Sequence, residues 1–178
     1  NEKPDVVIDV LDATNLDRHL YLAIQLLELG IQPILALNMW DEVKTKGYEI
    51  DINLLSKFLG LTIVTTNART GDGVKKLLET AILEYRKGEK TVSDFAVKLP
   101  DELETAVGQL KLEINKIADV KYNRRWVALQ LFEQDSEVDS FIRGIPEGPG
   151  IIALRDKLIG ELSRILGDTP ESYIAESR

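Results

Sequence analysis

The sequence contains no cysteine and a single histidine. Without cysteine, the chain cannot form a disulfide scaffold or a thiolate metal site. His19 is the only histidine, which excludes metal sites built from several histidines and argues against histidine-based catalysis. We therefore expect neither a catalytic residue nor a metal ligand set in this chain.

Long apolar runs and an excess of positive charge are also missing. No apolar run approaches the roughly 18 residues that a membrane-spanning helix requires. The 22 Lys and Arg residues are outnumbered by 30 Asp and Glu residues, and the formal net charge is -8. Since proteins bind nucleic acids largely by neutralising phosphates, this balance predicts no nucleic-acid partner. The 44% of hydrophobic and 29% of charged residues are typical of a globular chain.

Three short apolar runs in the first half predict β-strands, at residues 6–11, 33–37 and 62–65. Each run precedes a segment with apolar residues at helical spacing, at residues 16–30, 51–59 and 74–86. Gly30 and Gly60 stand where the first two helices should end. The alternation of buried strands with helices predicts an α/β fold with a parallel sheet.

The second half has a different pattern. Residues 87–94 are polar and predict a linker, and after Pro100 no strand pattern remains. Apolar stripes predict helices at residues 103–117, 125–132, 138–142, 151–166 and 170–177, with a loop at 144–150. We therefore predict two domains, an α/β domain at residues 1–92 and an all-α domain at 93–178.

Two tetrads follow the second and third predicted strands, where ligands of parallel sheets bind. The first, Asn38 to Asp41, has the form N-x-x-D; the second runs from Thr66 to Arg69. A carboxylate at Asp41 could accept hydrogen bonds from the ring N–H and the amino group of guanine, a donor pair that adenine lacks. Asn38 would join the neighbouring loops and reach the base edge. The alternative is that Asn38 and Asp41 only cap a helix or turn after the strand.

The second tetrad offers backbone N–H groups to the carbonyl oxygen of guanine, above all that of Ala68. The predicted guanine-binding residues are thus Asn38, Met39, Asp41, Thr66, Asn67 and Ala68.

Several segments resemble a known family. DATNLDRHLYLAIQLLELG (12–30), LALNMWDE (35–42) and TTNARTGDGV (65–74) closely resemble the cytosolic GTPase domain of ferrous iron transport protein B (FeoB). RRWVALQLFEQD (124–135) and LGDTPESYIAESR (166–178) resemble the helical domain of that family. The usual guanine motif of GTPases is N-K-x-D, and Met39 replaces its lysine. The resemblance implies that Met39 supplies the apolar contact to the base.

The resemblance implies GTP and GDP as ligands and a parent protein that hydrolyses GTP to regulate ferrous iron uptake. It places the chain at the cytoplasmic face of the cell membrane, with the membrane domain of the same protein as a partner. The helical domain would be a spacer that favours bound GDP. The alternative function is a non-catalytic interaction or regulatory module with a degenerate nucleotide fold.

Two GTPase motifs are missing from the sequence. There is no G-x-x-x-x-G-K-[ST] loop to hold phosphates, and no D-x-x-G precedes the first predicted strand. The resemblance implies that both motifs, with the Mg²⁺ site, lie upstream of Asn1. We therefore expect a truncated P-loop GTPase-type sheet of about three strands, inactive by itself. The free edge of its first strand leaves homo-oligomer formation or strand-edge pairing open.

Overall fold

The computed structural model describes residues 4–88, 95–117 and 120–178. The chain divides into two compact units, Asn1–Phe95 and Ala96–Arg178. The predicted boundary between residues 92 and 93 lies outside the described residues, as does most of the predicted linker.

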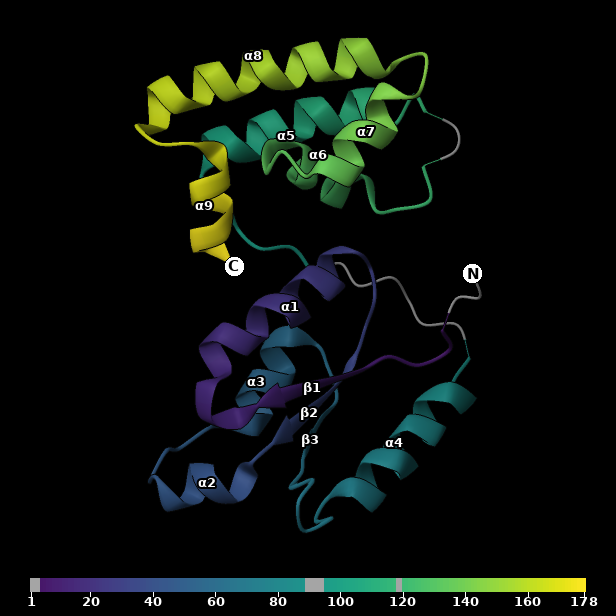
Figure 1. The fold of residues 1–178 in the computed structure, drawn as a ribbon, viewed down its shortest axis with the longest axis vertical. Helices are drawn as coiled ribbons and strands as arrows, with labels where there is room; N and C mark the ends of the chain where they lie inside the picture. Colours follow the sequence, from purple (N-terminus) through teal and green to yellow (C-terminus); the bar gives the residue numbers. More distant parts are fainter. Residues whose placement is uncertain (1–3, 89–94, 118–119) are drawn as a thin grey trace. The chain divides into compact units, whose positions relative to one another are not determined.

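The first unit is built on a parallel sheet of three strands in the order β1-β2-β3 (Figure 1). The strands are β1 (Ile8–Asp12), β2 (Ile34–Asn38) and β3 (Ile63–Thr65). In β2, the four residues Ile34 to Leu37 are all buried, as expected for a central parallel strand. The predicted α/β architecture is confirmed, although β1 and β2 begin and end one or two residues later than predicted.

A short 3₁₀ turn (Ala13–Asn15) and three α-helices connect the strands, and a fourth helix follows β3. The helices are α1 (Leu16–Glu28), α2 (Trp40–Thr45), α3 (Ile52–Leu59) and α4 (Val74–Arg86). Leu35 and Leu37 of β2 share a buried apolar cluster with Leu27 of α1 and Leu59 of α3. Helix α4 lies on the opposite side of the strands from α1 (Figure 1).

Strand β1 forms one edge of the sheet. Its inner edge pairs with β2, and within the described ranges no strand pairs with its outer edge. Val10 is 60% exposed and Ile8 37% exposed. An apolar strand edge of this kind is available to another β-strand.

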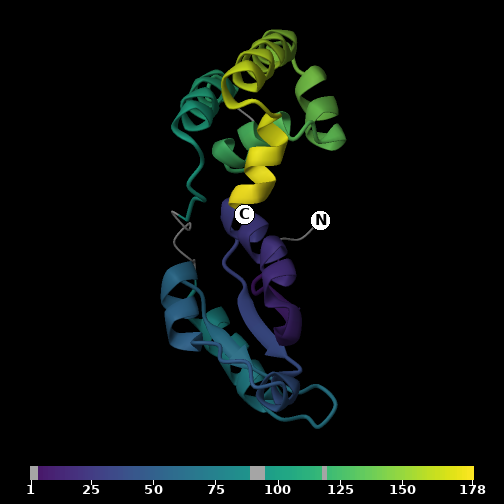
Figure 2. The same ribbon diagram turned by 90° about the vertical axis from the view of Figure 1, so that its left-hand side faces the viewer.

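The second unit consists of α-helices around one apolar cluster, as predicted (Figure 2). They are α5 (Asp101–Ile114), α6 (Arg124–Phe132), α7 (Ser136–Arg143), α8 (Gly148–Leu166) and α9 (Pro170–Ser177). Ion pairs join the helices at the edge of this cluster. The guanidinium of Arg155, which is 5% exposed, lies 3.0 Å from Asp139 of α7, and the guanidinium of Arg178 is paired with Glu133.

Two predicted helix bounds in this unit differ from the structure by three residues, and the others by two or fewer. Helix α5 ends at Ile114 rather than at residue 117. Helix α8 begins at Gly148 rather than at residue 151, so it includes part of the predicted loop. A Cβ atom on Gly148 would lie 1.8 Å from the carbonyl oxygen of Ile142, so the glycine permits a close approach of α8 to α7. In the described parts of the chain, no helix is long and apolar enough to cross a membrane.

Candidate functional site

The two tetrads lie side by side at the carboxyl edge of the sheet. Leu37 pairs with Thr65 in the register of β2 and β3, so the residues that follow both strands are neighbours. The backbone N–H of Thr66 donates to the carbonyl of Leu37 at 2.8 Å, and that of Trp40 donates to the carbonyl of Thr66 at 3.3 Å. The sheet therefore brings together the segments that the sequence analysis singled out.

Asn38 joins the two segments through its side chain. Its Oδ1 accepts the backbone N–H of Ala68 at 2.9 Å and lies 3.5 Å from the hydroxyl of Thr66. This is the loop-joining role predicted for Asn38. In this structure the N–H of Ala68, which was predicted to donate to guanine, is thus engaged by Asn38.

Asn67 shapes the loop that follows β3. Its Oδ1 accepts the backbone N–H groups of Arg69 at 3.1 Å and of Thr70 at 3.3 Å. Its backbone N–H donates to the carbonyl of Asp72 at 2.9 Å, which closes the loop from the other side. Asn67 is 8% exposed and Thr66 is 5% exposed. The side-chain oxygen of Asn67 therefore holds the loop together.

Gly73 ends this loop and precedes α4. Its φ is +74°, and a Cβ atom there would lie 2.1 Å from the carbonyl oxygen of Thr65. Any side chain at this position would collide with the end of β3. The glycine thus allows the loop to return to the strand from which it started.

Met39 lies in the left-handed region, with φ 59° and ψ 32°. This conformation costs a residue with a Cβ atom about 1–2 kcal/mol. It lets β2 end and α2 begin within one residue. Met39, and neither Asn38 nor Asp41, occupies the N-cap position of α2, and its side chain makes no capping bond. This helix of six residues was not predicted from the sequence, because it is too short to show a clear apolar period.

Asp41 lies in the first turn of α2 and pairs with Arg69. The Oδ2 of Asp41 is 3.2 Å from Nη2 of Arg69, and the two side chains are 43% and 80% exposed. No role was predicted for Arg69, since nothing in the sequence indicates its pairing with a residue 28 positions away. In this structure, the carboxylate predicted to read guanine therefore has an internal partner.

The end of β1 lies at the same carboxyl edge of the sheet as the two tetrads. Asp12 of β1 is opposite Asn38 in the sheet register. Its carboxylate accepts the backbone N–H and the hydroxyl of Thr14, both at 2.8 Å, and these bonds lower its pKa. Asp12 thus caps the 3₁₀ turn. In the described part of the chain, no group of three or more His, Cys, Asp and Glu residues could hold a metal ion.

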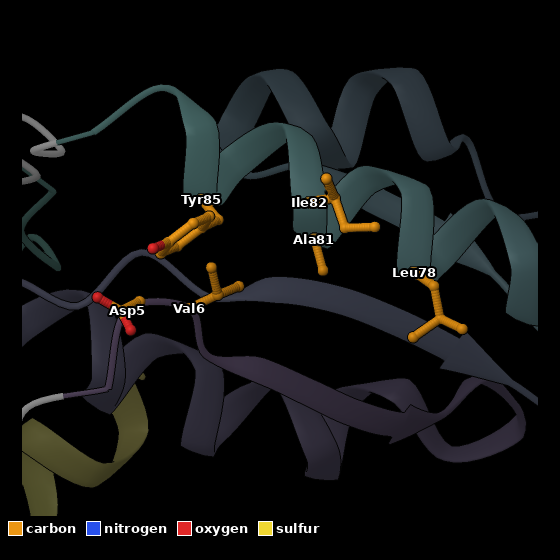
Figure 3. A pocket seen from close by; sticks show the side chains of 6 residues that line it. All are labelled: Asp5, Val6, Leu78, Ala81, Ile82 and Tyr85. Atoms are coloured by element: carbon orange, nitrogen blue, oxygen red, sulfur yellow. The ribbon is translucent and has the colours of Figure 1, made fainter.

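A separate apolar groove lies between α4 and the segment that leads into β1. Figure 3 shows it lined by Asp5, Val6, Leu78, Ala81, Ile82 and Tyr85. Its walls are mostly apolar, and it offers no convergent set of polar groups for a reaction. The tetrads at the strand ends, rather than this groove, form the candidate site.

Comparisons with known proteins find the same family in both units. Residues 1–81 match the family model "Ferrous iron transport protein B", and residues 100–178 match "FeoB cytosolic helical domain". The chain is 35% identical over 180 residues to the Fe(2+) transport protein A/Fe(2+) transporter FeoB fusion protein of Porphyromonas gingivalis. It is 37% identical over 132 residues to the Fe(2+) transporter FeoB of Escherichia coli. These alignments cover 99% and 74% of this chain, which spans only 21% and 16% of those relatives.

Comparisons with solved structures find the same family. A crystal structure of S. thermophilus NFeoB bound to GDP.AlF4- and K+ is 30% identical, with a TM-score of 0.81. The match covers 98% of this chain and 66% of that one. The cytosolic domain of the T. maritima FeoB iron transporter in apo form is 26% identical, with a TM-score of 0.72. That match covers 91% of this chain and 67% of the other.

Proposed function

The chain belongs to the ferrous iron transport protein B (FeoB) family through both of its units, and on that premise we propose that its first unit reads guanine. Asp41 accepts hydrogen bonds from the ring N–H and the exocyclic amino group of the base. Met39 provides an apolar contact, and Asn38 holds the loop of Thr66, Asn67 and Ala68 beside it. The ligand is GDP or GTP.

The observation that carries this proposal is the junction of the two tetrads through the bond between Asn38 and Ala68. It keeps the carboxylate of Asp41 and the backbone of the second tetrad on one edge of the sheet. Adenine offers a carboxylate no pair of adjacent donors and would leave its acceptors unpaired. The site therefore favours guanine over adenine.

We propose that phosphate binding and GTP hydrolysis depend on other parts of the parent protein. The 178 residues contain no phosphate-binding loop motif, so they offer no lysine or glycine-rich turn for the β- and γ-phosphates. Parent residues outside this chain would hold the phosphates and Mg²⁺. There, GTP binding and hydrolysis would regulate ferrous iron passage at the cytoplasmic face of the membrane. We expect no GTP hydrolysis by this chain alone.

For the second unit we propose a helical spacer between the guanine-reading unit and the membrane domain of the same protein. Its ion pairs support a rigid body. Glu104 of α5 pairs with Arg125 of α6, and Asp139 of α7 pairs with Arg155 of α8. A rigid spacer can transmit a change in nucleotide state to a partner domain.

Isothermal titration calorimetry with GDP and, separately, ADP tests the proposal. We expect GDP to bind weakly, because phosphate contacts are missing, but about tenfold or more tightly than ADP, the discrimination of one good bidentate pair. Equal affinity for both nucleotides would refute the assignment of Asp41. Binding of neither would favour the non-catalytic module.

The variant Asp41→Asn tests the residue itself. An amide at this position presents a donor, so we expect preference to move from GDP to xanthosine diphosphate, whose base carries a carbonyl in place of the amino group. Glu42→Gln is the matched control, because it removes a neighbouring carboxylate that pairs with Lys46. Unchanged base preference in Asp41→Asn would remove Asp41 from the site.

A further inference from the structure

The carboxylate of Asp41, which the proposed function assigns to the base, and the N–H of Ala68, which the sequence predicts as a donor to it, already have partners within the protein. Asp41 Oδ2 pairs with the guanidinium of Arg69, and the N–H of Ala68 donates to Asn38 Oδ1. The loop around them is satisfied as well, through the bonds that Asn67 accepts from Arg69 and Thr70. A guanine base that approaches this edge would therefore compete with Arg69 for Oδ2 of Asp41 and with Asn38 for the single N–H of Ala68.

The internal partners are chemically equivalent to the edge of guanine. A guanidinium presents adjacent N–H donors to a carboxylate, as do the ring N–H and amino group of guanine. The amide oxygen of Asn38 is an acceptor for Ala68, as the guanine carbonyl would be. In the structure one such donor, Nη2 of Arg69, contacts Oδ2 of Asp41, and Oδ1 of Asn38 accepts the N–H of Ala68.

We propose that Arg69 is a competing internal ligand of Asp41, so that it lowers the affinity of this site for guanine nucleotides and helps to release them. This inference rests on the proposed function, because it requires that Asp41 reads the base. Arg69 is suited to the role, since its side chain is 80% exposed and can leave Asp41 without uncovering apolar surface.

The expected effect is modest. The two side chains are largely exposed, and solvent-exposed ion pairs contribute little. Removing Arg69 should therefore strengthen GDP binding by about two- to fivefold. The direction is the diagnostic feature: GDP is an anion, so loss of a positive charge near its site would by itself weaken binding. A gain in affinity shows that Arg69 competes with the ligand.

The experiment is calorimetric titration of the whole chain with GDP and ADP, in the wild type and in Arg69→Ala. Arg86→Ala is the matched control, because it removes an exposed arginine at the far end of α4, away from the loop. We expect tighter GDP binding in Arg69→Ala alone. The gain should shrink in high salt, which screens the exposed ion pair.

The double variant Asp41→Asn with Arg69→Ala tests whether Arg69 acts through the carboxylate of Asp41. In Asp41→Asn, the neutral amide offers no ion pair to Arg69, so adding Arg69→Ala should leave affinity for xanthosine diphosphate unchanged or weaker. A similar gain in this background would contradict competition for Asp41.

The outcomes separate the two proposals. If the wild type prefers GDP over ADP but Arg69→Ala binds GDP equally or more weakly, the role of Arg69 is refuted while guanine recognition stands. If the wild type shows no preference, or binds neither nucleotide, both proposals fail. An equal gain in Arg86→Ala would also overturn the role of Arg69.

Discussion

Asn38 and Ala68 are 30 positions apart in the sequence, and the side-chain oxygen of Asn38 accepts the backbone N–H of Ala68 at 2.9 Å. This bond joins the ends of two neighbouring strands, β2 and β3. It positions the loop after β3 against the first turn of α2, where Asp41 lies. The amide side chain of Asn38 therefore adds to the backbone bonds of Thr66 that also join the two segments.

Asn38→Ala should weaken this junction. The variant leaves the N–H of Ala68 without its acceptor, which should lower the free energy of unfolding by about 1 kcal/mol. Urea unfolding measures the loss, and faster hydrogen exchange at the amide of Ala68 would locate it. Asn53→Ala on the exposed face of α3 is the control and should not destabilise. Unchanged exchange at Ala68 would contradict the role of Asn38.

Gly73→Ala should be far more damaging than Gly71→Ala. Both glycines have positive φ, so alanine at either position costs about 1–2 kcal/mol. A Cβ atom at Gly71 would meet nothing within 4 Å, whereas at Gly73 it would lie 2.1 Å from the carbonyl oxygen of Thr65. We expect the extra collision to lower the urea midpoint of Gly73→Ala well below that of Gly71→Ala. Equal midpoints would show that the loop can move away from β3 at little cost.

Asp9→Asn should stabilise the first unit at neutral pH. Asp9 is 8% exposed, and its Oδ2 has no hydrogen-bond partner within the described residues. Burial raises the pKa of Asp9 above its ordinary value of 3.8, although the charge of His19 partly opposes the shift. The folded state therefore favours the protonated carboxyl, and this contribution to stability is lost as the pH rises through the raised pKa.

Removing the charge should increase the free energy of unfolding at pH 7 by on the order of 1 kcal/mol. Chemical unfolding at pH 7 and near pH 4 measures this, and the gain should shrink at the lower pH. Asp17→Asn on the exposed side of α1 is the control. A gain that persists unchanged at low pH would exclude ionisation of Asp9 as its cause.

Glu104→Gln should destabilise the second unit in a pH-dependent way. Two hydrogen bonds from Arg125, at 2.6 and 2.7 Å, lower the pKa of Glu104 below its ordinary value of 4.5. A lowered pKa contributes stability above about pH 4.5 that is lost as the pH falls through the folded-state value.

Because the pair is partly exposed, we expect Glu104→Gln to lower the free energy of unfolding by only about 1 kcal/mol at pH 7, and by less at pH 3. Thermal unfolding at both pH values measures the difference. Glu102→Gln, on the exposed side of the same helix, is the control. An equal loss at both pH values would mean that the charge of Glu104 is not the cause.

The regular elements were predictable where the chain shows a clear period. Continuous apolar runs located the three strands, and the helix at Val74–Arg86 was predicted with its observed bounds. Prediction failed where a neighbouring element decides the conformation. Helix α8 begins at Gly148, where the backbone of Ile142 lies too close for any side chain, and α2 forms after a left-handed residue that no local propensity favours.

The sequence by itself determined the two-part architecture, the family and the positions of the tetrads, because each depends on local patterns of residues along the chain. Only the tertiary structure decided which of those residues meet. It engages Ala68 with Asn38 and pairs Asp41 with Arg69, because parallel pairing of β2 and β3 brings together two segments about 30 positions apart. Such pairings depend on strand register and loop geometry, which no single stretch of sequence encodes.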